Sequence, residues 1–352
     1  MTVTAMLGTA KGGFVARSNP GRSAWTIDEP LFKGWKVTAS ARDDKGRYFV
    51  ATASDVYGPA LHVSDDLEQW KQIEKGPSWA KDLDRKLNQI WTLHLGPGRY
   101  YAGVDEAGLF ASDDGGESWS PIEALNEHAT RSAWAPGAGG LCAHALLVDP
   151  KNTDRVWCGI SAVGVFRTED GGRSWHPKNQ GIPQVLEDKD HKDVGYCVHG
   201  LVADPEDANT IFRREHNGMF RSRDGGDSWE RIENGLPNWF GFPIAMDRRT
   251  RTIFVHPMES DEYRMPADGK FRMYRSRDGG DSWEPLTDGL PQQGAYMGVL
   301  RGALDCDQLD PCGVYVGTTA GTVYVSNNAG DSWTQLPCTL PRVLSVTVFN
   351  DG

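Results

Sequence analysis

An eight-residue signature occurs five times in this chain and constrains its fold more than any other feature. The shared pattern is Ser/Thr-x-Asp-x-Gly-x-x-Trp, with Asn328 in place of the Asp in the last copy. The hydroxyl and the carboxylate can hydrogen-bond the backbone of a tight turn, the Gly supplies a positive φ, and the Trp buries a large apolar surface. Each copy is therefore predicted to join two strands and to fix the turn against a neighbouring element. The five copies end at Trp119, Trp175, Trp229, Trp283 and Trp333.

Two weaker copies lie upstream and give seven Trp anchors in all. The segment Ser64 to Trp70 is one residue short, and the segment Ser18 to Trp25 keeps only the Ser-to-Trp spacing. The intervals run from 45 residues, between Trp25 and Trp70, to 56 residues, between Trp119 and Trp175. Such periods with strand signals are typical of propeller blades of about four strands each.

The repeat predicts an all-β fold, a seven-bladed β-propeller formed by residues 1–352 as a single domain. The N-terminal stretch supplies only two strands before its box, and the C-terminal stretch 343–349 reads as the missing strand. We expect this C-terminal strand to pair in the N-terminal blade and close the ring, because closure removes the exposed edges of an open sheet.

The signature resembles the Asp-box, or BNR repeat, of sialidase-like β-propellers. The resemblance covers nearly the whole chain and implies the propeller fold. It does not by itself imply an activity, because one fold hosts many unrelated sites.

Charge and composition exclude several classes of partner. The net charge is -11 and no run of Lys and Arg occurs, so neither nucleic acid nor an anionic membrane is an expected partner. No apolar stretch of about 18 residues exists, and the N-terminus lacks the pattern of a secretion signal. Six cysteines without a CxxC pair favour a reduced, cytoplasmic protein.

The long insertions are predicted to lie on the face opposite the boxes. Long loops gathered on one face of a rigid scaffold often carry function. Their aromatic residues Trp91, Trp134 and Trp239, together with Arg214, are the predicted substrate-binding residues, and packing of the loops is the alternative role of each aromatic. The insertions are residues 75–90, 123–141, 178–196, 235–241, 256–270 and 288–298.

A second repeat, Cys-x-His, marks two neighbouring blades. Cys142 and His144 begin one inner strand, and Cys197 and His199 begin the next in the same register. Residues two apart on a strand share a face, so these pairs are predicted to lie side by side at the mouth of the channel. His216 follows in the same sector, and three imidazoles suit zinc, iron, copper or nickel.

The predicted metal ligands are therefore His144, His199 and His216, with Glu215, Cys142 or Cys197 nearby, and no organic cofactor is expected. A general-base role for the histidines, or a purely structural one, is the alternative. With such a metal, the chain would be a small-molecule enzyme of metal-assisted hydrolysis or lyase-type elimination. Glu215 would be the base and Arg301 an anion contact.

Two other functions stay open. A sialidase-like glycoside hydrolase would, by the family resemblance, use arginines for the substrate carboxylate and a Tyr nucleophile with a Glu partner, for which Tyr296 and Glu215 are available. However, no Arg-Ile-Pro motif occurs near the N-terminus, and sialidase propellers have six blades. The third function is a binding or assembly platform without catalysis, with its partner on the long-loop face.

Overall fold

The chain folds almost entirely into antiparallel β-sheets. The computed structural model describes residues 1–351, and its helical elements are short: α1 (Glu123–Asn126) and two 3-10 helices, Arg131–Ala133 and Ala267–Gly269. The predicted all-β class is confirmed. No helix in these residues is long and apolar enough to cross a membrane.

Five separate sheets have four strands each, and neighbouring strands in each sheet are hydrogen-bonded. The first is β28 (Val343–Asp351), β1 (Thr2–Thr9), β2 (Gly12–Ser18) and β3 (Trp25–Ile27). The second is β4 (Lys36–Arg42), β5 (Tyr48–Ser54), β6 (Gly58–Ser64) and β7 (Lys71–Gln72). The third is β16 (Gly200–Ala203), β17 (Ile211–Glu215), β18 (Gly218–Ser222) and β19 (Glu230–Arg231). The fourth is β20 (Gly241–Asp247), β21 (Thr252–Pro257), β22 (Met273–Ser276) and β23 (Glu284–Leu286). The fifth is β24 (Leu304–Cys306), β25 (Val314–Gly317), β26 (Val323–Ser326) and β27 (Thr334–Gln335).

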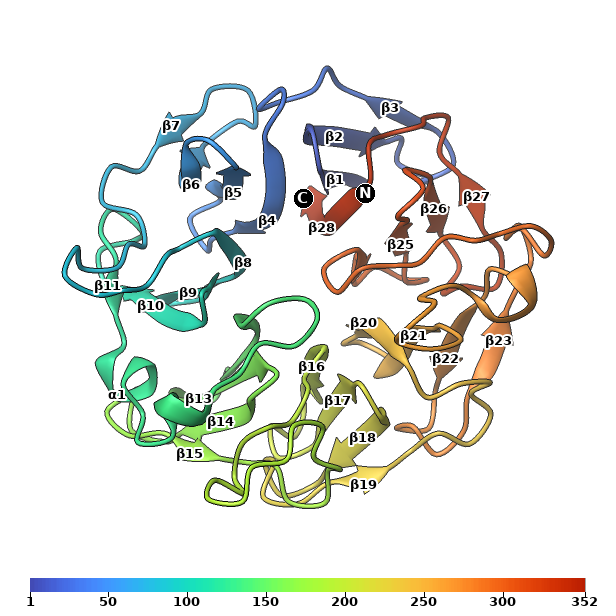
Figure 1. Cartoon of the computed structure of the whole chain (residues 1–352). Coiled ribbons are helices and arrows are strands. Elements are labelled where there is room, and N and C mark those ends of the chain that lie inside the picture. The colour runs from blue at the N-terminus through green and yellow to red at the C-terminus, as the bar shows by residue number, and fades with distance from the viewer. Residues whose placement is uncertain (352) are drawn as a thin grey trace.

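The remaining eight strands form two four-stranded units that are joined into one sheet by a single strand-paired residue pair. One unit is β8 (Gln89–Leu95), β9 (Tyr100–Asp105), β10 (Gly108–Ser112) and β11 (Ser120–Pro121). The other is β12 (Cys142–Asp149), β13 (Asn152–Ser161), β14 (Gly164–Thr168) and β15 (His176–Pro177). The pair Cys142 and Asp105 joins them. Figure 1 shows the sheets following one another in chain order around a ring.

The box turns link each sheet to the one before it. In the box of β18, the Gly226 amide donates to Ser222 Oγ over 2.7 Å, and Gly226 has a φ of 94°. The Trp229 amide donates to the carbonyl of Gln180 over 3.0 Å, in the link that leaves the preceding sheet. The fourth strand of every unit begins at its Trp anchor or one residue after it, as the repeat predicts.

The hydrophobic core lies between adjacent sheets. One cluster joins Trp157 of β13 with Val198, Phe220 and Trp229 of the next unit, and all four side chains are buried. Each sheet therefore buries both faces against its neighbours.

The two ends of the chain pair with each other. Strand β28 is antiparallel to β1, with a register that runs from Thr2 opposite Asp351 to Thr9 opposite Val343. Figure 1 places both ends on the inner side of the first sheet. The predicted pairing of the C-terminal strand in the N-terminal sheet is confirmed.

Candidate functional site

A cavity of about 980 Å³ opens where the innermost strands of several sheets approach one another. Strands β4, β8, β12, β16, β20 and β28 line its wall, and the long loops 123–141, 256–270 and 288–298 contribute to its rim. Its lining includes Trp91, His144, His199, Phe242 and Arg301. The inner strands and the long loops thus meet at one site.

His199 is held with one ring nitrogen free. Its Nδ1 lies 2.7 Å from the carbonyl oxygen of Gly241. A carbonyl only accepts, so Nδ1 carries the proton and Nε2 keeps its lone pair. Burial, and then the charge of Arg301, lowers the pKa of His199 well below its usual value, so the ring is neutral at neutral pH.

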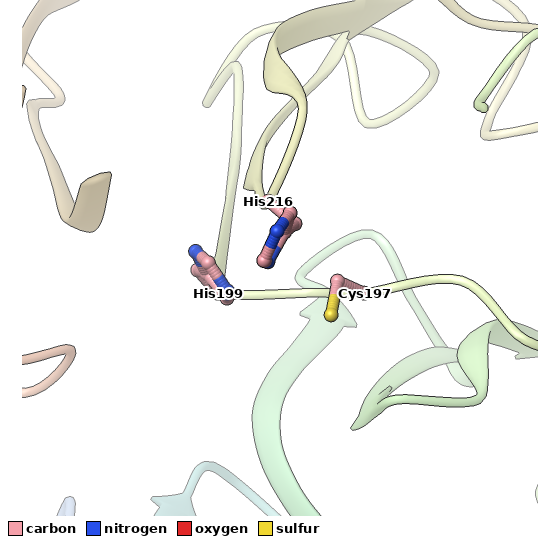
Figure 2. Close-up of side chains that lie close together, drawn as sticks. All are labelled: Cys197, His199 and His216. Atoms are coloured by element: carbon pink, nitrogen blue, oxygen red, sulfur yellow. The ribbon is translucent and has the colours of Figure 1, made fainter. Parts of the chain in front are cut away.

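His199 belongs to a group of three side chains with metal-ligating atoms. One such atom from each of Cys197, His199 and His216 lies within 4.8 Å of the other two, and Figure 2 shows the three side chains close together. Cys197 and His199 come from the segment that leads into β16, and His216 from the turn between β17 and β18. The Nε2 atom of His216 lies 3.2 Å from Asp261 Oδ2, so this carboxylate can hold the ring and leave Nδ1 free.

His144 is not part of this group, which corrects the predicted set of three histidines. Its Nε2 lies 2.9 Å from Ser161 Oγ, and that hydroxyl donates to the carbonyl of Val198 over 2.6 Å. Ser161 therefore accepts from Nε2–H, and His144 Nδ1 is an unprotonated, buried nitrogen without a partner. Cys197 takes the third place because it lies two residues from His199 on the same extended segment, whereas His144 stands on the neighbouring sheet.

Arg301 lies between two aromatic rings of the cavity wall. Its Cζ is 5.8 Å from the ring centroid of Trp91 and 4.7 Å from that of Phe242. Its Nε is buried and has no acceptor. Burial lowers the pKa of Arg301, and the nearby thiols of Cys142 and Cys197 raise it.

Glu215 does not line the cavity, which corrects its predicted role as the base. The residue is fully buried at the end of β17. Its Oε1 accepts from the Asn217 amide over 2.8 Å, and its Oε2 has no partner. Burial raises its pKa to about 7, although Arg213 acts in the opposite direction. A carboxyl group sealed behind the wall cannot reach a bound substrate.

The predicted substrate-binding residues divide between the cavity and other places. Trp91 lines the cavity, and Tyr296, predicted as catalytic, lies at its rim with 69% of its surface exposed. Trp134 is buried against Phe166, so it packs its loop instead. Trp239 is 57% exposed and does not line the cavity.

The predicted role of Arg214 in substrate binding is also corrected by the structure. Its side chain is fully buried, and its three guanidinium nitrogens have no hydrogen-bond partner. Strand β20 covers it, because a Cβ at Gly241 would lie 2.5 Å from one of its Nη atoms. It cannot contact a ligand in the cavity.

Several residues of the site carried no signal in the sequence. Gly241 and Asp261 hold the two histidines, and they act through a backbone carbonyl and an ordinary surface carboxylate. Lys36, at the start of β4, and Arg342, in the link before β28, add positive charge to the cavity. The matched Cys-x-His register, which already included Cys197, and the long-loop residues Trp91 and Tyr296 pointed toward this place.

Comparison with known proteins gives distant relatives. No family model matches the chain. The oligoxyloglucan-reducing end-specific xyloglucanase of Emericella nidulans is 27% identical over 248 residues, which cover 69% of this chain and 24% of that enzyme. The photosystem II assembly lipoprotein Ycf48 of a Synechococcus strain is 22% identical over 294 residues, which cover 73% of this chain and 78% of that protein. The chain thus spans about a quarter of the length of the xyloglucanase it matches.

Solved structures show the same fold in other proteins. An ancestral GH74 enzyme superposes with a TM-score of 0.56 at 18% identity, over 82% of this chain and 36% of that one. A putative 6-phosphogluconolactonase from Bacteroides fragilis superposes with a TM-score of 0.56 at 9% identity, over 99% and 98% of the two chains. The chain is therefore an all-β protein whose structural neighbours are propeller enzymes. Its resemblance to the Asp-box family stays a prediction.

Proposed function

We propose that the chain is a closed seven-bladed β-propeller and a metal-dependent enzyme that acts on a small molecule in the central cavity, which the metal would reach through His199, the one of its three ligands that lines the wall. The seven four-stranded units, their order around a ring and the pairing of β28 with β1 support the propeller. The group of Cys197, His199 and His216 supports the metal.

The observation that carries the proposal is how the two histidines are held. The Gly241 carbonyl fixes Nδ1 of His199, and the Asp261 carboxylate fixes Nε2 of His216. Histidines that ligate metals usually donate their second ring N–H to a carbonyl or a carboxylate in this way. The other nitrogen of each ring is then free to ligate, and one ligating atom of each ring lies within 4.8 Å of the Cys197 sulfur.

The donor set fits a transition metal such as zinc, iron, copper or nickel. Two imidazoles and one thiolate are donors that these ions accept. Burial raises the pKa of Cys197 to about 11, so the ion would have to displace the thiol proton. Three protein ligands leave a position for water or substrate, and an ion there would act as a Lewis acid or activate water for hydrolysis or elimination.

The residues of the chain would then have separate roles. His144 would not serve as the base, because its Nδ1 is buried and because burial, together with the charge of Arg301, lowers its pKa well below its usual value. Arg301 would bind and orient the substrate. Trp91 and Phe242 would hold Arg301 in place and keep water from its faces.

Metal content is the direct test. The as-purified protein should contain about one equivalent of one transition metal by elemental analysis. His199→Ala and Cys197→Ser should each lower metal affinity by more than the ~10–100-fold that changes around the ligands cause. The matched control is His176→Ala, an exposed histidine on β15, which should leave metal content unchanged.

The same variants can contradict the proposal. Protein that is metal-free and remains so after incubation with each of the four ions would exclude the metal. Equal metal retention in wild type and His199→Ala would show that the ion sits elsewhere.

A glycoside hydrolase is the second candidate, and the similarity to xyloglucanases favours it. Aromatic residues such as Trp91 and Tyr296 in the cavity are compatible with a sugar ring. Such enzymes, however, generally use a pair of carboxyl groups, and among residues 1–351 Asp105 is the single acidic residue that lines this cavity. Burial raises the pKa of Asp105, as a general acid requires. Loss of xyloglucan cleavage in Asp105→Asn, with metal absent, would favour this candidate.

An assembly platform is the third candidate, because Ycf48 is matched over most of its length. Exposed apolar side chains on the loops around the cavity would form the contact, among them Trp239, Tyr263 and Tyr296. A partner that binds wild type and His199→Ala equally, but not Trp239→Ala, would favour it.

A further inference from the structure

Arg301 is a largely buried cation for which the protein supplies no anion. Within residues 1–351, no carboxylate lies within ion-pair distance of its guanidinium; its titratable neighbours are the thiols of Cys142 and Cys197, whose pKa burial raises, and the cation of Arg264. Its Nε has no acceptor. Burying a charge without a partner is costly, so the arrangement needs a compensating group from outside the chain.

Buried arginines of this protein are either paired with carboxylates or closed off inside the fold; Arg213, for example, is fully buried and donates to Asn179 Oδ1 and to the carbonyl of Cys197. Arg221 lies 2.8 Å from Asp281, and Arg275 lies 2.6 Å from Asp331. Arg214 is also unpaired, but it is sealed under β20, whereas Arg301 lines the cavity. Among these, only Arg301 can be reached by a ligand.

The surroundings of Arg301 keep its guanidinium in place with an open side. Trp91 and Phe242 contact it through their rings, and Arg stacks well on aromatic faces. Gly139 lies next to the nitrogens, and a Cβ there would be 3.4 Å from Nη1 and 3.5 Å from Nη2. The missing side chain leaves room beside the two groups that would donate to a ligand.

The charge of the cavity is opposite to that of the whole protein. The chain carries a net charge of -11, yet the basic residues Lys36, Arg264, Arg301 and Arg342 line the cavity with a single acid, Asp105. Exposed Asp55 pairs with Lys36, and the other three cations have no acidic partner in the described part of the chain. A concave site lined by one sign of charge concentrates ligands of the other sign.

We infer that Arg301 binds the carboxylate of a small organic acid, whose body lies against Trp91 and the rim residue Tyr296. The planar guanidinium fork matches a carboxylate through two parallel hydrogen bonds. The aromatic wall favours a flat or ring-shaped body next to it. This inference names the class of substrate for the proposed function. It rests on the proposed function only for the reaction, because Arg301 can bind a carboxylate whether or not a metal is present.

Matched pairs of charged and neutral probes test the inference by calorimetry on the full chain. Benzoate should bind and benzamide should not, and glucuronate should bind more tightly than glucose. Arg301→Gln should weaken benzoate binding by about 10- to 100-fold, the range expected for hydrogen bonds to a charged group. Arg301→Lys should recover only part of it, because the ammonium lacks the fork. Arg223→Gln is the control, since Arg223 is 63% exposed in a box turn.

Thermal unfolding gives a readout that a purely structural arginine would not show. Benzoate should raise the Tm of wild type through linkage, and not that of Arg301→Gln. Without ligand, Arg301→Gln should melt no lower than wild type, because the variant removes an uncompensated buried charge. A large drop in Tm would mean that Arg301 serves the fold and would overturn the inference.

The remaining outcomes separate this inference from the metal proposal. Benzoate binding that survives removal of all metal would support the anion site and leave the metal proposal to its own test. If metal-loaded protein binds benzamide as tightly as benzoate, the metal proposal is unaffected and the anion site is contradicted. Binding of inorganic phosphate in the absence of carboxylate binding would reject the carboxylate.

Discussion

At the residue scale, the box turns depend on hydrogen bonds to a single acidic side chain. Asp278 accepts from the Ser276 hydroxyl and the Ser282 amide through Oδ1, and from the Ser282 hydroxyl through Oδ2. In the last box, Asn328 makes the same bonds through Oδ1, and its Nδ2 donates to Ser332 Oγ over 2.9 Å. The turn thus tolerates an amide because the serine hydroxyl can act as donor or acceptor.

Because Asp278 has a carboxylate where Asn328 has an amide, we predict that the stability contributed by the Asp278 turn falls at low pH. Burial raises the pKa of Asp278, but the hydrogen bonds from Ser282 and Ser276 outweigh it and lower the pKa to about 2. At pH values between the folded and the unfolded pKa of Asp278, the unfolded chain, in which Asp has its usual pKa of ~3.9, binds more protons than the folded chain. The contribution of Asp278 to stability is therefore full above pH ~4 and is lost as the pH falls toward about 2.

Urea unfolding at several pH values can check this. Asp278→Asn should leave the fold intact, as the Asn328 box shows, and should make the free energy of unfolding less dependent on pH between ~4 and ~2. Exposed Asp288, outside the boxes, is the control for replacement by Asn. An equal pH dependence in wild type and Asp278→Asn would contradict the role of the carboxylate.

At the element scale, each box is a connector between sheets. The Trp229 indole Nε1 donates to the carbonyl of Lys178 over 3.0 Å, and its ring packs against Trp157 of the preceding unit. Trp25, in the weakest copy, bonds only within its own turn, to the carbonyl of Arg22, and is half-buried. The indoles of Trp119, Trp175 and Trp333 also donate within their own turns, and the ring of Trp25 lies 5.6 Å from that of Tyr315 on the neighbouring sheet. The strong and weak copies therefore differ in how deeply the Trp is buried.

Replacement of the two tryptophans should show this difference. Trp229→Ala should cost roughly 3–5 kcal/mol of stability, because a buried aromatic leaves a cavity between two sheets. Trp25→Ala should cost less. Benzoate binding per folded molecule should survive in both, since neither residue lines the cavity. A stable Trp229→Ala variant that loses binding would contradict the separation of turn and site.

At the scale of the whole molecule, the pairing of β28 with β1 decides whether the ring is closed. Eight residues of β1 have partners on β28. Without β28, β1 would present an unpaired edge, and the buried Val343 and Val346 would leave the cluster that they share with Val3 and Leu7.

Truncation tests the closure. Removal of residues 343–352 should cause aggregation or a loss of stability far above the ~1 kcal/mol of an average point mutation. A chain that lacks only residues 351–352 is the matched control, and its Tm should be close to that of the full chain. A chain without residues 343–352 that stays monomeric and melts like wild type would contradict the closed ring.

The sequence by itself determined the sheets, the position of each fourth strand and the pairing of the two ends. These features follow from turn chemistry and strand period, which act over a few residues and recur about every 50 residues. It also predicted that His199 and His216 come near each other, and the structure brings them together with Cys197. Local sequence patterns were therefore sufficient to predict these features.

Only the tertiary structure decided which of the candidate residues meet. It set His144 against Ser161, enclosed Glu215 and Arg214, and buried Trp134 under its own loop. It brought the Gly241 carbonyl and Asp261 to the two histidines. These outcomes depend on how insertions from separate sheets pack over one opening, and no local pattern encodes that packing, because the contacts join residues far apart in the chain.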